Sequence, residues 1–300
     1  MNVDNPLKLI SLCTGYAGLD IGIDRATGRN TRPVAYCERE MYAAKNLCAK
    51  IEEGKLHPAP IFTDVKTFPF AAFRGKVDII TGGYPCQPFS FAGKRLGRED
   101  PRHLWPYIAK GIRAARPSLC FFENVEGHLS EGFREVSHSL RRLGYSIEAG
   151  IFSAAEVGAP HQRKRLFILG VGDSEYARQL VSRSIKATQR EPRGQEGSIK
   201  QSKRSSKLSY ADSKRRDGDK LPRRQGEKQS RTPLLCSNVG RWPARPNEQQ
   251  HEWEEPRTKP KMGRAVNGAR SRVDELRLLG NGVVPATAEL AFRTLIEKFM

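Results

Sequence analysis

The chain has 300 residues, which is enough for one large domain or two small ones with a substantial core. Its 52 Lys and Arg outnumber its 33 Asp and Glu, and the formal net charge of +19 points to a polyanionic partner such as nucleic acid. The six cysteines form no CxxC pair and no closely spaced ladder, which argues against a metal site and a disulfide scaffold. Without a leader-like start or a run of eighteen apolar residues, we expect a cytoplasmic protein with no membrane segment.

The first half of the chain predicts strands and helices in alternation. Apolar runs indicate strands at residues 7–12, 34–38, 61–65, 77–81, 118–123, 145–149 and 165–170. Helical composition is found from about residue 19 and over residues 41–52, 104–115 and 133–143. This alternation predicts an α/β fold, in which a mainly parallel, Rossmann-like sheet has helices on both faces.

The composition changes near Gly172. Residues 180–231 contain sixteen Lys and Arg, six Asp and Glu and few large apolar side chains, so we expect part of this stretch to be disordered. The last forty residues are globular again and end in an amphipathic helix. The predicted organisation is therefore a domain at residues 1–172, a basic region at 173–262 and a C-terminal segment at 263–300 that returns to the first domain.

The turn after the strand at 77–81 holds the first candidate for a catalytic residue. Two glycines end the strand, and Pro85 and Pro88 restrict the backbone on either side of Cys86. The thiol is thereby held at the carboxyl end of a strand, where open α/β sheets bind their ligands. A structural cysteine in a turn is the alternative, but the rigid and polar setting favours a nucleophile.

Three strand ends in the first part of the chain suggest an adenosyl cofactor. The turn from Gly15 to Gly18 resembles the dinucleotide fingerprint without matching it, and Glu38 ends the second strand, where such folds bind ribose hydroxyls. Asp64 follows the third strand and is placed to accept a hydrogen bond from an adenine amino group. The missing glycines argue against a pyrophosphate cradle. Each feature alone is often structural, but their order favours a phosphate-free nucleoside such as S-adenosylmethionine.

Charged and polar residues are also expected at this edge of the sheet, next to two further strands. Glu123 and Asn124 end the fifth strand, and a carboxyl facing N3 of a pyrimidine would raise electrophilicity at C6, where a thiolate adds. Arg163 and Arg165 lead into the last strand and would bring guanidinium groups to the same edge. The alternatives are a helix-capping or surface role for the carboxyl and a solvated basic cluster.

The order of these motifs resembles that of the DNA (cytosine-5) methyltransferases over roughly residues 7–172 and 272–299. The resemblance implies a methyltransferase fold and a role for each matched residue. Cys86 would be the nucleophile, Glu123 would bind a flipped cytosine, and Asn124 would orient the Cys86 turn. Arg163 and Arg165 would hold the base and the site. The cofactor S-adenosylmethionine would be bound by Gly15, Gly18, Glu38, Asp64, Pro85, Leu104 and Asn281.

The resemblance also implies a substrate. The basic region would be a small irregular target recognition domain on duplex DNA, and a monomer would methylate C5 of cytosine in a specific sequence, as in restriction-modification. The alternatives are methylation of structured RNA, a catalytically silent DNA-binding relative, and a disordered basic insertion that gives only non-specific affinity. The chain departs from the family's pattern at five positions, none of which removes a reacting group: Cys13, Ala17, Tyr84, His161 and Gly282.

Overall fold

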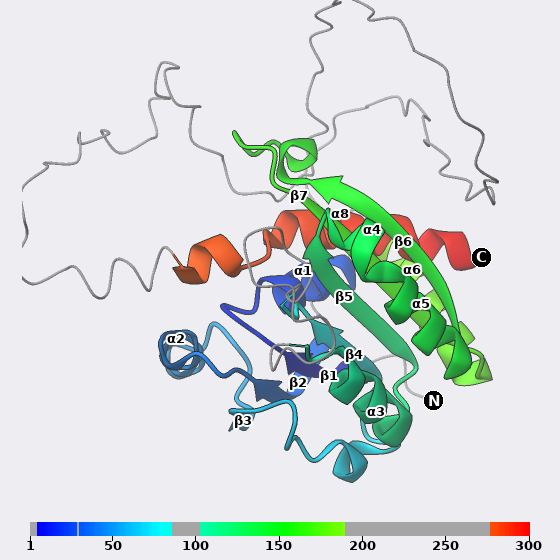
Figure 1. The fold of residues 1–300 in the computed structure, drawn as a ribbon, viewed down its shortest axis with the longest axis horizontal. Coiled ribbons are helices and arrows are strands. Elements are labelled where there is room, and N and C mark those ends of the chain that lie inside the picture. The colour runs from blue at the N-terminus through cyan, green and yellow to red at the C-terminus, as the bar shows by residue number, and fades with distance from the viewer. Residues whose placement is uncertain (1–4, 29, 86–102, 190–276) are drawn as a thin grey trace, which may run out of the picture.

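The computed structural model describes residues 5–28, 30–85, 103–189 and 277–300. The predictions for Cys86 and for most of the basic region fall outside these residues. A seven-stranded sheet in the order β3-β2-β1-β4-β5-β7-β6 forms the centre of the described part (Figure 1). Its strands are β1 (Leu7–Leu12), β2 (Thr31–Cys37), β3 (Ile61–Phe62), β4 (Ile79–Gly82), β5 (Leu119–Val125), β6 (Tyr145–Ser153) and β7 (Lys164–Gly172).

The sheet is mainly parallel, as predicted. Only β7 runs against its neighbours, pairing antiparallel with both β5 and β6. In the parallel centre, Ser11 of β1 lies opposite Thr81 of β4. The carboxyl ends of these strands therefore meet at one edge, which is where ligands bind in such sheets.

Helices cover both faces of the sheet, which confirms the predicted fold class. They are α1 (Gly18–Ala26), α2 (Met41–Glu52), α3 (Trp105–Ala115), α4 (His128–Glu131), α5 (Phe133–Arg142), α6 (Glu175–Gln189) and α8 (Pro285–Ile296). Because successive strand residues point to opposite faces, Phe121 joins the core beneath α1, α6 and α8, whereas Phe122 joins the core beneath α3 and α5.

Helix α6 extends the packed fold beyond residue 172, where the chain becomes more polar. Its buried residues Ala177, Leu180, Val181 and Ile185 share one core with α1 and α8. Residues 175–189, which composition assigned to the basic region, therefore form a helix that packs with the first domain. The average composition of this stretch is polar because the outer face of α6 is polar, although the inner face has apolar residues at helical spacing.

The C-terminal segment returns to the sheet, and α8 lies along α1 (Figure 1). A side chain at Gly22 of α1 would come within 2.5 Å of the Ala288 side chain, so the glycine permits this close approach. The chain end is thereby brought beside the turn that follows β1. None of the helices in the described ranges has the length and hydropathy needed to span a bilayer.

Candidate active site at the carboxyl edge of the sheet

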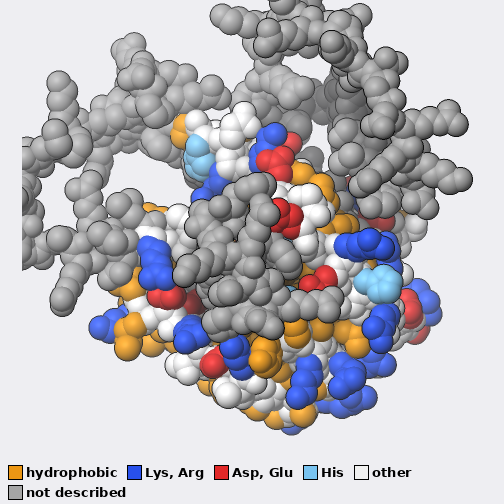
Figure 2. All heavy atoms as spheres, viewed as in Figure 1, with side chains coloured by type: hydrophobic (Ala, Val, Ile, Leu, Met, Phe, Trp, Pro, Cys, Tyr) orange, Lys and Arg blue, Asp and Glu red, His pale blue; other side chains and the backbone are white. Residues whose placement is uncertain are grey.

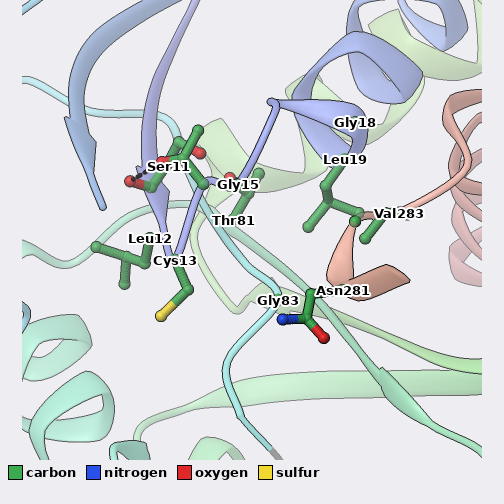
Figure 3. A pocket seen from close by; sticks show the side chains of 12 residues that line it. Ser11, Leu12, Cys13, Gly15, Gly18, Leu19, Thr81, Gly83, Asn281 and Val283 are labelled. Carbon is green, nitrogen blue, oxygen red and sulfur yellow. Dashed lines mark hydrogen bonds between the residues drawn. The ribbon is translucent and has the colours of Figure 1, made fainter. Parts of the chain in front are cut away.

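A pocket lies at the carboxyl ends of β1 and β4, and we call it the strand-edge pocket (Figure 3). Figure 3 shows Leu12 and Cys13 on one side and Asn281 and Val283 on the other. Its walls combine hydroxyl, amide, backbone and apolar groups from three distant parts of the chain: Ser11, Leu12, Cys13, Thr14, Gly15, Gly18, Leu19, Thr81, Gly83, Asn281, Gly282 and Val283.

The turn between β1 and α1 is tightly wound around this pocket. Cys13, Gly15 and Ala17 all have positive φ angles, of 50°, 57° and 67°. The Glu38 carboxylate fixes the turn, because it accepts hydrogen bonds from the backbone N–H of Gly15 at 2.7 Å and of Glu40 at 2.8 Å. Glu38 therefore borders the pocket through the turn that it holds.

The structure brings together only some of the predicted cofactor residues. Gly15, Gly18 and Asn281 line the pocket. Asp64 lies at the end of β3 near Cys13, whose thiol pKa is raised by burial and by the Glu38 and Asp64 carboxylates, among others. Pro85 is exposed just beyond the pocket's Gly83.

Leu104 is also absent from the pocket walls. It lies at the start of α3 and packs, half-buried, against the core beneath α3 and α5.

Three linked polar residues, two in the pocket wall and one beneath it, were not predicted from the sequence. Thr81 donates a hydrogen bond to Asp20 Oδ1 at 2.7 Å, and Asp20 is buried. Burial raises the pKa of Asp20 to about 6, although hydrogen bonds with the hydroxyls of Ser11 and Thr81 oppose the shift. The available signal was the position of Asp20 between Leu19 and Ile23, which places it on the inner face of α1.

A second group of residues, the β5–β7 cluster, comprises Glu123, Asn124, Arg163 and Arg165. Arg165 Nε lies 2.9 Å from Glu123 Oε1, and Glu123 is only 6% exposed. Burial raises the pKa of Glu123 to about 7, and the charges of Arg165 and Arg163 limit the shift. The cluster thus holds a buried carboxyl with a raised pKa beside a fixed positive charge.

Asn124 connects the cluster to the strand that leads to Cys86. Its side-chain amide donates to the carbonyl of Tyr84 at 3.2 Å, and Tyr84 precedes Cys86 by two residues. The Tyr84 ring packs near Trp105 and Phe122, and its hydroxyl lies 3.1 Å from His128 Nε2. The residues before Cys86 are therefore held at both the backbone and the side chain.

Arg163 connects the cluster to the C-terminal segment. It has a positive φ of 37°, and its guanidinium donates to the carbonyl of Gly280 at 2.8 Å and to that of Gly282. The structure therefore brings Arg163 to the backbone that walls the strand-edge pocket, and Arg165 to Glu123. Across the described ranges, no group of three or more His, Cys, Asp or Glu residues is arranged to hold a metal ion.

Known proteins that are similar to this chain include two bacterial methyltransferases and one solved structure. The Type II methyltransferase M.PspPI of Psychrobacter sp. (strain TA137) is 35% identical over 175 residues, and M.Eco47II of Escherichia coli is 30% identical over 174 residues. Each match covers 56% of this chain but 40% of the relative's length. A solved DNMT2 mutant from Spodoptera frugiperda matches 56% of this chain and 51% of its own at 20% identity, with a TM-score of 0.47.

The family comparison spans nearly the whole chain. The description "C-5 cytosine-specific DNA methylase" matches residues 7–295, which include both the strand-edge pocket and the β5–β7 cluster. The chain belongs to the family of C-5 cytosine-specific DNA methylases.

Proposed function

We propose that this chain transfers a methyl group from S-adenosylmethionine to C5 of cytosine in a specific duplex DNA sequence. One observation carries the proposal: the strand-edge pocket and the β5–β7 cluster share a border. Gly83 lines the pocket, and a side chain at Gly83 would come within 3.3 Å of Glu123 Oε2. A methyl donor in the pocket and a base at Glu123 would therefore be neighbours.

The strand-edge pocket fits S-adenosylmethionine by its chemistry. Gly15 lines the pocket, and a Cβ at this position would meet no atom within 4 Å, so there is open space beside the turn. The hydroxyls of Ser11 and Thr81 and the amide of Asn281 offer polar contacts for an amino acid moiety. Glu38 keeps lone pairs for ribose hydroxyls, and Asp64 is the proposed partner of the adenine. When bound, the cofactor supplies an electrophilic methyl group.

Cys86 is the proposed nucleophile. A base within a duplex is stacked on both sides, so the target cytosine has to leave the helix before its C6 is accessible. The Cys86 thiolate then forms a bond to C6, and the electron density displaced to C5 allows C5 to accept the methyl group. Loss of the C5 proton and departure of the thiolate restore the aromatic ring.

Glu123 is the proposed partner of N3 and of the exocyclic amine. With a pKa of about 7, it is substantially protonated at neutral pH and so can donate to N3. Proton donation to N3 withdraws electrons from the ring and favours addition at C6. Arg165, paired with the other side of the carboxyl, keeps Glu123 in one orientation.

Residues 190–262 are the proposed target recognition region. The names of the Type II relatives favour a role in restriction-modification, and the proposed location is the cytoplasm. Phosphate contacts would position this region, and contacts with base edges would select the sequence.

A trapping experiment tests the proposal. Duplex DNA containing 5-fluorocytosine in many sequence contexts should form a covalent adduct that requires S-adenosylmethionine, because fluorine at C5 prevents the final elimination. Cys86→Ala should abolish the adduct, whereas Cys48→Ala, at an exposed cysteine of α2, should leave it intact. An adduct formed only with structured RNA would move the substrate to RNA. No adduct with either would leave the silent DNA-binding relative.

A further inference from the structure

The Tyr16 ring packs directly against Gly282, although 266 positions separate the two residues in the sequence. A side chain at Gly282 would come within 1.8 Å of the Tyr16 ring, so the ring lies where any larger residue would project. Gly282 has no positive φ, so its backbone alone would accept serine. The missing side chain at position 282 is thus matched by an aromatic ring at position 16.

Tyr16 also makes a hydrogen bond to the same segment. Its hydroxyl donates to the carbonyl of Val283, and burial raises the pKa of Tyr16 to about 12, so the donor proton is retained under physiological conditions. Gly18 allows this approach, because a side chain there would come within 2.0 Å of the Val283 carbonyl. Lys50 of α2 steadies the other side, donating to the Tyr16 carbonyl at 3.0 Å with its ammonium 5.2 Å from the ring centroid.

The segment held in this way forms one wall of the strand-edge pocket. Arg163 binds the carbonyls of Gly280 and Gly282 from the side of β7, while Tyr16 binds Val283 from the side of β1. Asn281 lies between these two attachments and lines the pocket (Figure 3).

We propose that Tyr16 is a positioning residue for the cofactor, which holds residues 280–283 against the β1–α1 turn and keeps Asn281 at the pocket wall. This inference rests on the proposed function, because it takes S-adenosylmethionine as the ligand of the pocket. Tyr16 reaches the ligand only through the segment that it holds. Its loss should therefore weaken cofactor binding more than it slows methyl transfer at saturating cofactor.

Calorimetric titration of the full chain with S-adenosylhomocysteine tests the proposal. Tyr16→Phe removes only the hydroxyl and leaves the Val283 carbonyl without its donor, so the Kd should rise about tenfold. Methyl transfer to unmethylated DNA should show a similar rise in KM for S-adenosylmethionine, with kcat within about twofold of the wild type. Tyr176→Phe is the matched control. Tyr176 lies on α6, outside the pocket, and its hydroxyl donates to Asp78 at 2.7 Å. Removal of this hydroxyl should leave the Kd unchanged.

A double substitution makes the test sharper. Gly282→Ser should weaken binding at least as much as Tyr16→Phe, because the ring has to leave its place and break the bond to Val283. In the Tyr16→Ala background the same serine has room, so the double variant should bind no more weakly than Tyr16→Ala alone. Thermal unfolding midpoints of all variants identify any that fail to fold, and Tyr16→Phe, which loses one oxygen atom, provides a result even then.

The experiment distinguishes failure of the positioning role from failure of the proposed function. If the wild-type chain binds S-adenosylhomocysteine but Tyr16→Phe and Gly282→Ser bind within twofold of it, the positioning role is wrong while the cofactor assignment stands. Independent losses that multiply in the double variant would also overturn the pairing. If the wild type itself does not bind, the proposed function fails.

Discussion

Asp20 places a titratable carboxyl beneath the strand-edge pocket, where it links β4 to the first turn of α1. Because its pKa rises from 3.8 to about 6 on burial, the folded chain binds a proton there that the unfolded chain releases. The stabilising contribution is therefore complete below about pH 3.8 and is lost as the pH rises through about 6. Tyr36, whose pKa is affected by Asp20, stays protonated throughout this range.

Asp20→Asn should consequently change the pH dependence of stability. The amide keeps an acceptor for Thr81 but cannot ionise, so the variant should gain on the wild type by about 1 kcal/mol between pH 5 and pH 8. Urea unfolding of both proteins at pH 5, 6, 7 and 8 measures this difference and cancels the titration of groups that they share. A difference that stays constant with pH would show that Asp20 has an ordinary pKa.

At the scale of elements, the C-terminal helix α8 is an integral part of the packed fold. Phe292 is fully buried, and its ring packs edge-on against Phe121 of β5 with the centroids 5.3 Å apart. Its removal would leave a cavity between α8 and the central sheet. The segment that walls the pocket at residues 281–283 leads directly into this helix, so the packing of α8 also supports the pocket.

Phe292→Ala should therefore destabilise the fold by about 3–5 kcal/mol. Thr294→Ala, at an exposed position of the same helix, should change the free energy of unfolding by less than about 0.5 kcal/mol. Denaturant unfolding followed by tryptophan fluorescence measures both. A Phe292→Ala variant as stable as Thr294→Ala would mean that α8 is not packed on the sheet.

The elements also show what could be predicted from the sequence. Strands β1, β4 and β5 are short apolar runs, and Glu38 after β2 and Glu123 in β5 lie at the predicted edge. The average composition did not predict α6, because its apolar face with helical spacing lies within a polar stretch. The pairing of Tyr16 with Gly282 could not be predicted, because local periodicity contains no information on which distant segments meet.

At the scale of the whole molecule, positive charge is spread over both the described fold and the region outside it. Residues 190–276 contain twenty-two Lys and Arg and twelve Asp and Glu, so about half of the net charge of +19 lies elsewhere in the chain. Figure 2 shows basic side chains gathered over α3 and α5. The exposed Lys and Arg residues on and next to these helices are Lys110, Arg113, Arg116, Arg134, Arg141 and Arg142.

Binding to DNA without a target sequence should therefore depend strongly on salt. Each phosphate neutralised by a cation releases a counterion, and six or more such contacts would weaken binding about a thousandfold between 50 and 200 mM salt. Fluorescence anisotropy with a labelled duplex over this range gives the slope of log K against log salt. Binding of S-adenosylhomocysteine, a small ligand with no phosphate and no net charge, serves as the control and should change less than about twofold. A slope close to zero for DNA would remove the electrostatic argument for a nucleic-acid partner. A steep slope for DNA, together with salt-independent binding of S-adenosylhomocysteine, would place the excess positive charge on the DNA-binding surface.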